Sequence, residues 1–96
     1  MTKAEIVNQI ATKTGIERVI VQAVVESFME SMKENMIKGE NVYLRGFGSF
    51  ILKKRAEKLG RNIKKNTEVL IPAHMVPFIK FCDEFMEEVK SKVKVK

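Results

Sequence analysis

Cysteine and histidine, the residues that most often carry nucleophilic or metal chemistry, are nearly absent from this sequence. The one cysteine, Cys82, excludes a disulfide within the chain and is typical of a reducing compartment. The one histidine, His74, lies beside a proline-flanked turn, and neither residue has the partners that a nucleophile or a metal site requires. A phosphate-binding glycine loop of the nucleotide-binding type is also absent. We therefore expect that the protein is not an enzyme, and that it has no catalytic residue and binds no metal, cofactor or small-molecule substrate.

Long hydrophobic runs are absent too. No uninterrupted apolar stretch approaches the ~20 residues that span a bilayer, so no membrane partner is expected. The first 30 residues lack the apolar segment of a signal peptide, because polar residues interrupt it: Asn8, Gln9, Thr12, Lys13 and Thr14. We therefore expect a cytoplasmic protein. Its 96 residues suffice for one domain, with a thin core unless a partner extends it.

The excess positive charge is confined to one short segment. Residues 1–52 hold six lysines and arginines against six glutamates, and residues 66–96 hold five lysines against five acids. Residues 53–65 hold seven basic side chains against the single acid Glu57, which accounts for the whole net charge of +6. Such a concentration indicates a polyanion partner more strongly than a generally basic composition would.

Two helices are predicted in the N-terminal part of the chain. Thr2 and Glu5 have the spacing of a capping box, and Gly15 supplies a stop after an apolar helical pattern. A second helix is expected over about 17–38, ended by Gly39. Its apolar side chains cover about half of the circumference, more than the roughly 100° stripe of an ordinary surface helix. We therefore expect it to pack against the first helix and against a second copy of the chain, in an obligate dimer.

The apolar period changes after these helices. Residues 42–52 alternate apolar and polar side chains on either side of a turn bracketed by two glycines, which predicts a β-hairpin. Residues 67–73 are expected to form a third strand that stops at Pro72. The intervening 55–66 would then be a long hairpin excursion, although KKRAEKL (residues 53–59), which overlaps its start, fits a helix equally well.

A last helix is expected to begin at Pro77, because proline suits the first helical position. Its apolar face would comprise Phe78, Phe81, Cys82, Phe85, Met86 and Val89. All six phenylalanines are expected to be buried inside the body of the protein or in a dimer interface: Phe28, Phe47, Phe50, Phe78, Phe81 and Phe85. We therefore expect no aromatic platform on which the bases of single-stranded nucleic acid could stack.

These elements give the order ααβββα and an α+β fold in a single domain over 1–96. We expect a helical dimerisation body over 1–39, a sheet over 40–76 that carries an arm at about 53–71, and a C-terminal helix and tail over 77–96.

Three motifs in this order closely resemble the HU/IHF family of bacterial histone-like DNA-bending proteins, and HU most of all. They are GFGSF after two helices, GRN in the basic segment and IPAxxVPFIK before the last helix. The resemblance covers essentially the whole chain, without a length change in the arm. It implies an intertwined dimer with two β-ribbon arms that extend from a three-stranded antiparallel sheet and wrap around double-stranded DNA in the minor groove. It also implies a place in the bacterial nucleoid.

The resemblance assigns DNA-binding roles to two groups of residues. On the arm they are Lys53, Arg55, Lys58, Arg61, Asn62, Ile63, Lys64 and Lys65; on the body they are Lys3, Gly46 and Lys80. Lys3 and Lys80 would each lie near the first turn of a helix, where free N–H groups already favour an anion. Lysines alone would also fit a solvated loop, but two arginines, an asparagine and an apolar residue in the arm favour DNA, whose narrow minor groove attracts arginine.

Two departures from the family pattern alter these expectations. The family usually carries proline directly after GRN, and here that residue is Ile63. Proteins such as HU and IHF insert an apolar wedge between base pairs, and isoleucine can serve as one, with a softer kink than rigid proline gives. Alternatively, Ile63 packs across the arm onto Leu59 or onto a partner subunit. On the body, Met75, Asp83 and Glu84 make one flank less basic than is usual, which weakens contacts to wrapped DNA.

The function expected from these observations is architectural DNA binding by a dimer, either a homodimer or a heterodimer with a paralogue. Sequence preference should be weak, because the arm offers few groups that read bases. Two alternatives stay open. One is a site-specific DNA-bending subunit of the integration-host-factor type, and the other is a basic hairpin that grips an acidic protein or RNA.

Overall fold

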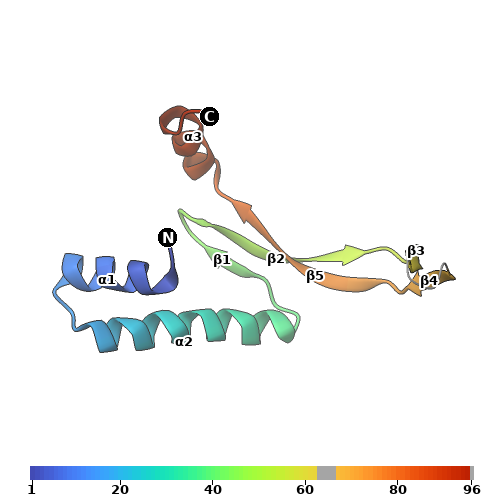
Figure 1. The fold of residues 1–96 in the computed structure, drawn as a ribbon, viewed down its shortest axis with the longest axis horizontal. Coiled ribbons are helices and arrows are strands. Elements are labelled where there is room, and N and C mark those ends of the chain that lie inside the picture. The colour runs from blue at the N-terminus through green and yellow to red at the C-terminus, as the bar shows by residue number, and fades with distance from the viewer. Residues whose placement is uncertain (63–66, 96) are drawn as a thin grey trace.

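The computed structural model describes residues 1–62 and 67–95, so the predictions for Ile63, Lys64 and Lys65 lie outside the described residues. Helices and strands follow one another along an elongated molecule, and the α+β class is confirmed (Figure 1). The elements are α1 (Lys3–Thr14), α2 (Arg18–Ile37), β1 (Val42–Leu44), β2 (Gly48–Arg55), β3 (Lys58–Asn62), β4 (Thr67–Ile71), β5 (His74–Phe81) and α3 (Asp83–Lys92).

The first helix begins and ends where its capping residues predict. The Thr2 hydroxyl accepts a hydrogen bond from the Glu5 N–H at 3.3 Å, which satisfies one of the free donors of the first turn. Gly15 adopts a left-handed φ of 74°, and its N–H donates to the Ala11 carbonyl. These local signals alone fix both ends of α1.

The second helix spans nearly the predicted residues and lies against α1 (Figure 1). Val7 of α1 and Val21 of α2 are buried, with exposed fractions of 1% and 4%. Other apolar residues of α2 are far more open, and Val24 and Phe28 are 62% and 48% exposed. Contact with α1 therefore covers only part of the wide apolar face of α2.

The main sheet is antiparallel and has β2 in the middle, between β1 and β5. β1 and β2 flank a tight turn in which Gly46 has a φ of 81°, so the predicted hairpin is confirmed. β2 pairs with β5 along its whole length, from Gly48 opposite Phe81 to Arg55 opposite His74. β3 and β4 form a separate two-stranded sheet at the end of this ribbon farthest from the helices (Figure 1).

The strand predicted over 67–73 forms, but it is not part of the main sheet. β4 ends at Ile71, directly before Pro72, because proline has no N–H to donate to a ladder. Its partner is β3, which lies within 55–66 and makes the predicted hairpin excursion; the helical alternative for KKRAEKL is not adopted. The third strand of the main sheet is β5 instead.

The prediction that the last helix begins at Pro77 is wrong, because α3 begins at Asp83. Pro77 lies within β5, opposite Leu52, and the expected boundary between sheet and helix at residue 77 falls inside a strand. β5 is at the edge of the sheet, where a residue without an N–H is tolerated. Phe78 and Phe81 therefore belong to a strand and not to a helix face.

A single chain encloses very little core. Its radius of gyration is 19.0 Å, whereas a compact domain of this length would have one of about 12–13 Å. Among the described residues, the buried hydrophobic side chains are Val7 and Val21. Five of the six phenylalanines are more than a third exposed in the single chain, so the expected burial of these rings requires a second chain: Phe28, Phe47, Phe78, Phe81 and Phe85.

Candidate nucleic-acid interface

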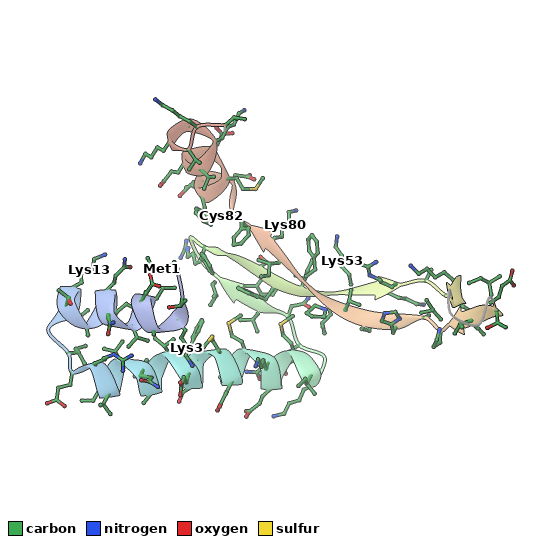
Figure 2. All side chains as sticks on the ribbon, viewed as in Figure 1. Met1, Lys3, Lys13, Lys53, Lys80 and Cys82 are labelled. Carbon is green, nitrogen blue, oxygen red and sulfur yellow. The ribbon has the colours of Figure 1, made fainter. Side chains whose placement is uncertain are left out.

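The two faces of the β2–β5 ribbon differ in chemistry. Residues directly opposite each other in an antiparallel pair have their side chains on the same face. Ser49 lies opposite Lys80, Lys53 opposite Val76, and Arg55 opposite His74, so this face carries three cations. Figure 2 shows Lys53 and Lys80 on the side of the ribbon turned away from α2. We call this surface, made of Ser49, Ile51, Lys53, Arg55, His74, Val76, Phe78 and Lys80, the cationic face.

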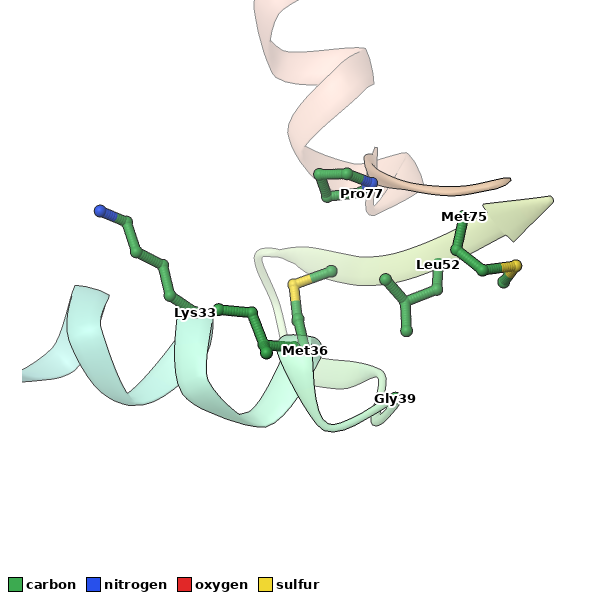
Figure 3. Close-up of a pocket in the computed structure, with 7 residues that line it drawn as sticks. Lys33, Met36, Gly39, Leu52, Met75 and Pro77 are labelled. Atoms are coloured by element: carbon green, nitrogen blue, oxygen red, sulfur yellow. The ribbon is translucent and has the colours of Figure 1, made fainter. Parts of the chain in front are cut away.

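The other face turns towards α2 and is apolar there, while Lys54, opposite Met75, is the one cation among its paired residues. Leu52, Met75 and Pro77 of the ribbon line a cavity of about 500 Å³ together with Met36 and Ile37 from the end of α2. Figure 3 shows Leu52, Met75 and Pro77 on one side of this cavity and Met36 on the other. Since this face is directed to the helical body, the cationic face is the one left for a partner outside the body.

The outer part of the arm continues the basic segment. Lys58 lies opposite Ile71 in the β3–β4 pair, and the backbone of Arg61 lies opposite that of Glu68. Lys53, Lys54, Arg55 and Lys58 are all exposed. Lys53, Lys54, Arg55 and Lys58 therefore follow one another along one continuous projection of the chain.

Lys3 lies in the first turn of α1, as expected, but it has a partner within the chain. Its Nζ donates to Oε1 of Glu26 at 2.8 Å, and Nε2 of Gln22 donates to the same oxygen at 3.2 Å. The hydrogen bond from Lys3, followed by that from Gln22, lowers the pKa of the Glu26 carboxyl below its usual value. Sequence reasoning missed this pair because its members are 23 residues apart on two helices.

Lys80 is not in the first turn of a helix, which corrects the expectation for this residue. It lies in β5, and its side chain belongs to the cationic face opposite Ser49. The first turn of α3 holds Asp83 and Glu84 instead, and these acids suit the free N–H groups there.

Gly46 occupies the predicted turn beside the start of α3. A shallow pocket there is lined by Arg45 and Gly46 from the turn and by Cys82, Asp83 and Glu84 from the start of α3. The Cys82 N–H donates to the Phe47 carbonyl at 3.0 Å, which ties the two segments together. A phosphate near Gly46 would therefore meet one cation and two acids.

Sequence reasoning assigned no DNA-binding role to five residues of the cationic face: Ser49, Ile51, His74, Val76 and Phe78. The period-two alternation of residues 74–81 was the available signal for the strand, but Pro77 also fits the start of a helix. Among the residues described, no group of three His, Cys, Asp or Glu side chains could hold a metal ion. In the same part of the chain, no helix combines the length and apolar character needed to cross a membrane.

Comparisons with known proteins agree with this arrangement. Residues 1–90 match the family described as bacterial DNA-binding protein. The chain is 40% identical over 95 residues to integration host factor subunit beta from Marinobacter nauticus, which covers 98% of this chain and 97% of the relative. It is 34% identical over 90 residues to DNA-binding protein HU from Thermotoga maritima, which covers 94% of this chain and 100% of the relative.

A solved structure is similar along almost the whole fold. A cocrystal structure of HU with DNA from Anabaena superposes with a TM-score of 0.88 at 36% sequence identity, over 93% of this chain and 97% of that one. The resemblance of the sequence motifs is thus confirmed by a family match, by relatives and by a fold. The chain belongs to the HU/IHF family of bacterial DNA-binding proteins.

Proposed function

We propose that two copies of this chain form a dimer that binds double-stranded DNA through its arms, with weak sequence preference, and bends it. The observation that carries the proposal is the concentration of the whole net charge in residues 53–65, a segment that begins on the β2–β5 ribbon, where one face carries Lys53, Arg55 and Lys80. Cations on such a ribbon contact phosphates and release counterions, and this favours any duplex regardless of sequence. The bacterial nucleoid, within the cytoplasm, is the proposed place of action.

The exposed apolar surface of the single chain supports the dimer. Monomeric proteins rarely leave large contiguous apolar patches open to water, and such patches mark interfaces. Here Val24 and Phe28 of α2 and Phe47, Phe81 and Phe85 near α3 are all more than a third exposed. A second copy that covers them would supply the core that one chain lacks.

Phe28→Lys tests the dimer. Its matched control is Ser27→Lys, at the exposed position of α2 directly before Phe28. We expect Phe28→Lys to dissociate and unfold the protein, because a cation would replace an apolar side chain at the interface, while Ser27→Lys leaves a dimer. Sedimentation velocity and circular dichroism measure both outcomes. A wild-type protein that sediments as a folded monomer at micromolar concentration would refute the dimer.

The remaining site assignments follow from this proposal. Lys53, Arg55, Lys58, Arg61, Lys64 and Lys65 would contact phosphates along the minor groove, with Asn62 beside them. Ile63 would enter a base step as the apolar wedge, since unstacking a step costs a few kcal/mol that additional phosphate contacts can offset. The body would contribute three further phosphate contacts, from Lys3, Gly46 and Lys80. Lys3 would have to leave Glu26 to make its contact.

Competition binding tests the partner class. A labelled 30-base-pair DNA duplex is displaced by unlabelled DNA duplex, by RNA duplex of equal length and by a polyglutamate chain at the same salt concentration. We expect the DNA duplex to compete best, because minor-groove contacts depend on the groove shape of B-form DNA. Better competition by RNA or by polyglutamate would refute the proposal in favour of the basic-hairpin alternative.

A second candidate is site-specific DNA bending, since integration host factor beta subunits reach 38–40% identity with this chain and HU proteins 33–36%. Affinities for a pool of random duplexes and for individual duplexes selected from it, measured at fixed salt, separate the two. Weak preference predicts similar affinities for all of them, whereas a site-specific subunit would bind the selected duplexes about 10³–10⁷-fold more tightly.

A further inference from the structure

The ammonium group of Lys53 lies over the ring of Phe78. Nζ is 3.8 Å from the ring centroid, well within the ~6 Å limit of a cation–π interaction. The register explains this contact, because Phe78 lies opposite Ile51 and Lys53 lies opposite Val76, so the two are diagonal neighbours on the cationic face. A long side chain on β2 thus reaches a ring on β5.

Phe78 differs in its surroundings from the other phenylalanines of the sheet and of α3. Phe47, Phe50, Phe81 and Phe85 pack ring against ring, with centroid distances of 5.3–6.2 Å. Phe78 instead faces a cation and is 44% exposed, on the side of the ribbon turned away from the cavity beside α2. Its ring is therefore available to hold a side chain on the outer surface.

We propose that Phe78 is a positioning residue for DNA binding, because its ring holds the Lys53 ammonium ready for a phosphate. The inference rests on the proposed function, in which the cationic face meets DNA. Lysine is flexible and loses considerable rotamer freedom when it is fixed by a partner. A ring that already restrains Lys53 removes part of this loss before DNA arrives.

The contact leaves the ammonium able to bind a phosphate. An ammonium has three donors, and a ring on one side leaves donors free on the other. Along the cationic face, Lys53 and Phe78 lie between Arg55 at one end and Lys80 at the other. The restrained ammonium would therefore complete a row of cations at the base of the arm, where the ribbon leaves the body.

Phe78→Leu tests the proposal because it keeps an apolar side chain and removes the aromatic face. Phe78→Tyr, which keeps that face, is the matched control, and both changes are also made together with Lys53→Met. Binding of the full-length proteins to a labelled random-sequence DNA duplex is measured over a range of salt concentrations. Thermal unfolding followed by circular dichroism verifies that every variant is folded at the assay temperature.

We expect Phe78→Leu to weaken binding by about two- to fivefold for each engaged arm, and Phe78→Tyr to bind like the wild type. In the Lys53→Met background, Phe78→Leu should cause no further loss of affinity. Lys53→Met alone should lower the salt dependence of binding as much as the double variant does. Equal or tighter binding by Phe78→Leu would overturn the proposal, as would an equal loss in the Lys53→Met background. Failure of the wild type to bind duplex DNA would refute the proposed function itself.

A second measurement needs no variant. In the nuclear magnetic resonance spectrum of the free wild-type protein, the Lys53 ε-methylene protons should be shifted upfield by the ring current of Phe78. Their resonance at the position of an unrestrained lysine would contradict the positioning role even if Phe78→Leu fails to fold.

Discussion

Lys3 and Glu26 join the first two helices through an ion pair in which Nζ lies 2.8 Å from Oε1. Both side chains are about half exposed, so a phosphate can reach the lysine only by competing with the carboxylate. We predict that Glu26→Gln raises the affinity for duplex DNA by about two- to fivefold, in line with the strength of exposed ion pairs. Fluorescence anisotropy with a labelled duplex at fixed salt measures the change.

The control for this prediction is Glu30→Gln, which removes the same charge from an exposed position of α2. It should raise the affinity less than Glu26→Gln, because only the general repulsion of DNA changes. In a Lys3→Met background the two changes should have equal effects. Equal effects in the wild-type background would show that Lys3 is not held back from DNA by Glu26.

The same ion pair predicts a dependence of stability on pH. The hydrogen bond from Lys3 and then that from Gln22 lower the pKa of Glu26 in the folded state below its ordinary value of 4.5. The stabilisation is therefore fully present above that ordinary pKa and is lost as the pH falls through the lowered pKa of the folded protein. Melting temperatures of the wild type and of Glu26→Gln should differ at neutral pH and converge in acid. A difference that stays constant or grows as the pH falls below 4.5 would contradict this account.

A packing prediction concerns Gly48, where β2 begins. A Cβ at this position would lie 2.8 Å from the Lys80 carbonyl oxygen and 3.2 Å from the Phe81 Cα, both of which belong to the backbone of β5. Gly48→Ala should therefore destabilise the fold by about 1–3 kcal/mol, because the two strands must separate. Urea denaturation gives the free energy of unfolding.

Gly60→Ala is the comparison for Gly48→Ala. Its added Cβ would meet Ile71 Cδ1 at 3.0 Å, and this atom is the end of a side chain that can rotate away. We expect a much smaller loss of stability than for Gly48→Ala. If the two alanine variants lose stability equally, the close approach of β2 and β5 at Gly48 does not limit the fold.

Local signals in the sequence predicted the elements that depend on them. Thr2 and Gly15 cap α1 through contacts within a few residues, so their spacing was sufficient. The charged arm was also predictable, because the segregation of charge into 53–65 needs no three-dimensional information. The relation to HU and integration host factor followed from three short motifs and is confirmed by the family match.

What the sequence did not reveal depends on pairing between distant segments. Pro77 fits the start of a helix locally, but β5 pairs with β2 over eight positions, and these contacts override the local preference. For the same reason Lys80 lies on a strand and not, as expected, in the first turn of a helix. The partnerships of Lys3 with Glu26 and of Lys53 with Phe78 join separate elements, and no sequence spacing indicates them.

The wedge role of Ile63 stays a prediction, and bending separates it from simple binding. Ile63→Ala should keep most of the affinity for linear duplex but reduce the bend, because the arm cations remain while the group that parts the base step is removed. Energy transfer between labels at the two ends of a duplex measures the bend. Leu59→Ala, which removes another apolar side chain of the arm that is 68% exposed, is the control and should leave bending unchanged. Unchanged bending by Ile63→Ala would remove Ile63 from the mechanism.

The salt dependence of DNA binding tests the central claim most directly. Lys53, Arg55 and Lys58 of the arm are replaced together by glutamine and compared with an equal charge removal at Lys13, Lys38 and Lys94, which are exposed outside the arm. Removing one cation that binds a phosphate should lower the slope of log K against log salt by about 0.9. We predict a clear fall for the arm variant and an unchanged slope for the other. Equal slopes for both variants would contradict the assignment of DNA binding to the arms.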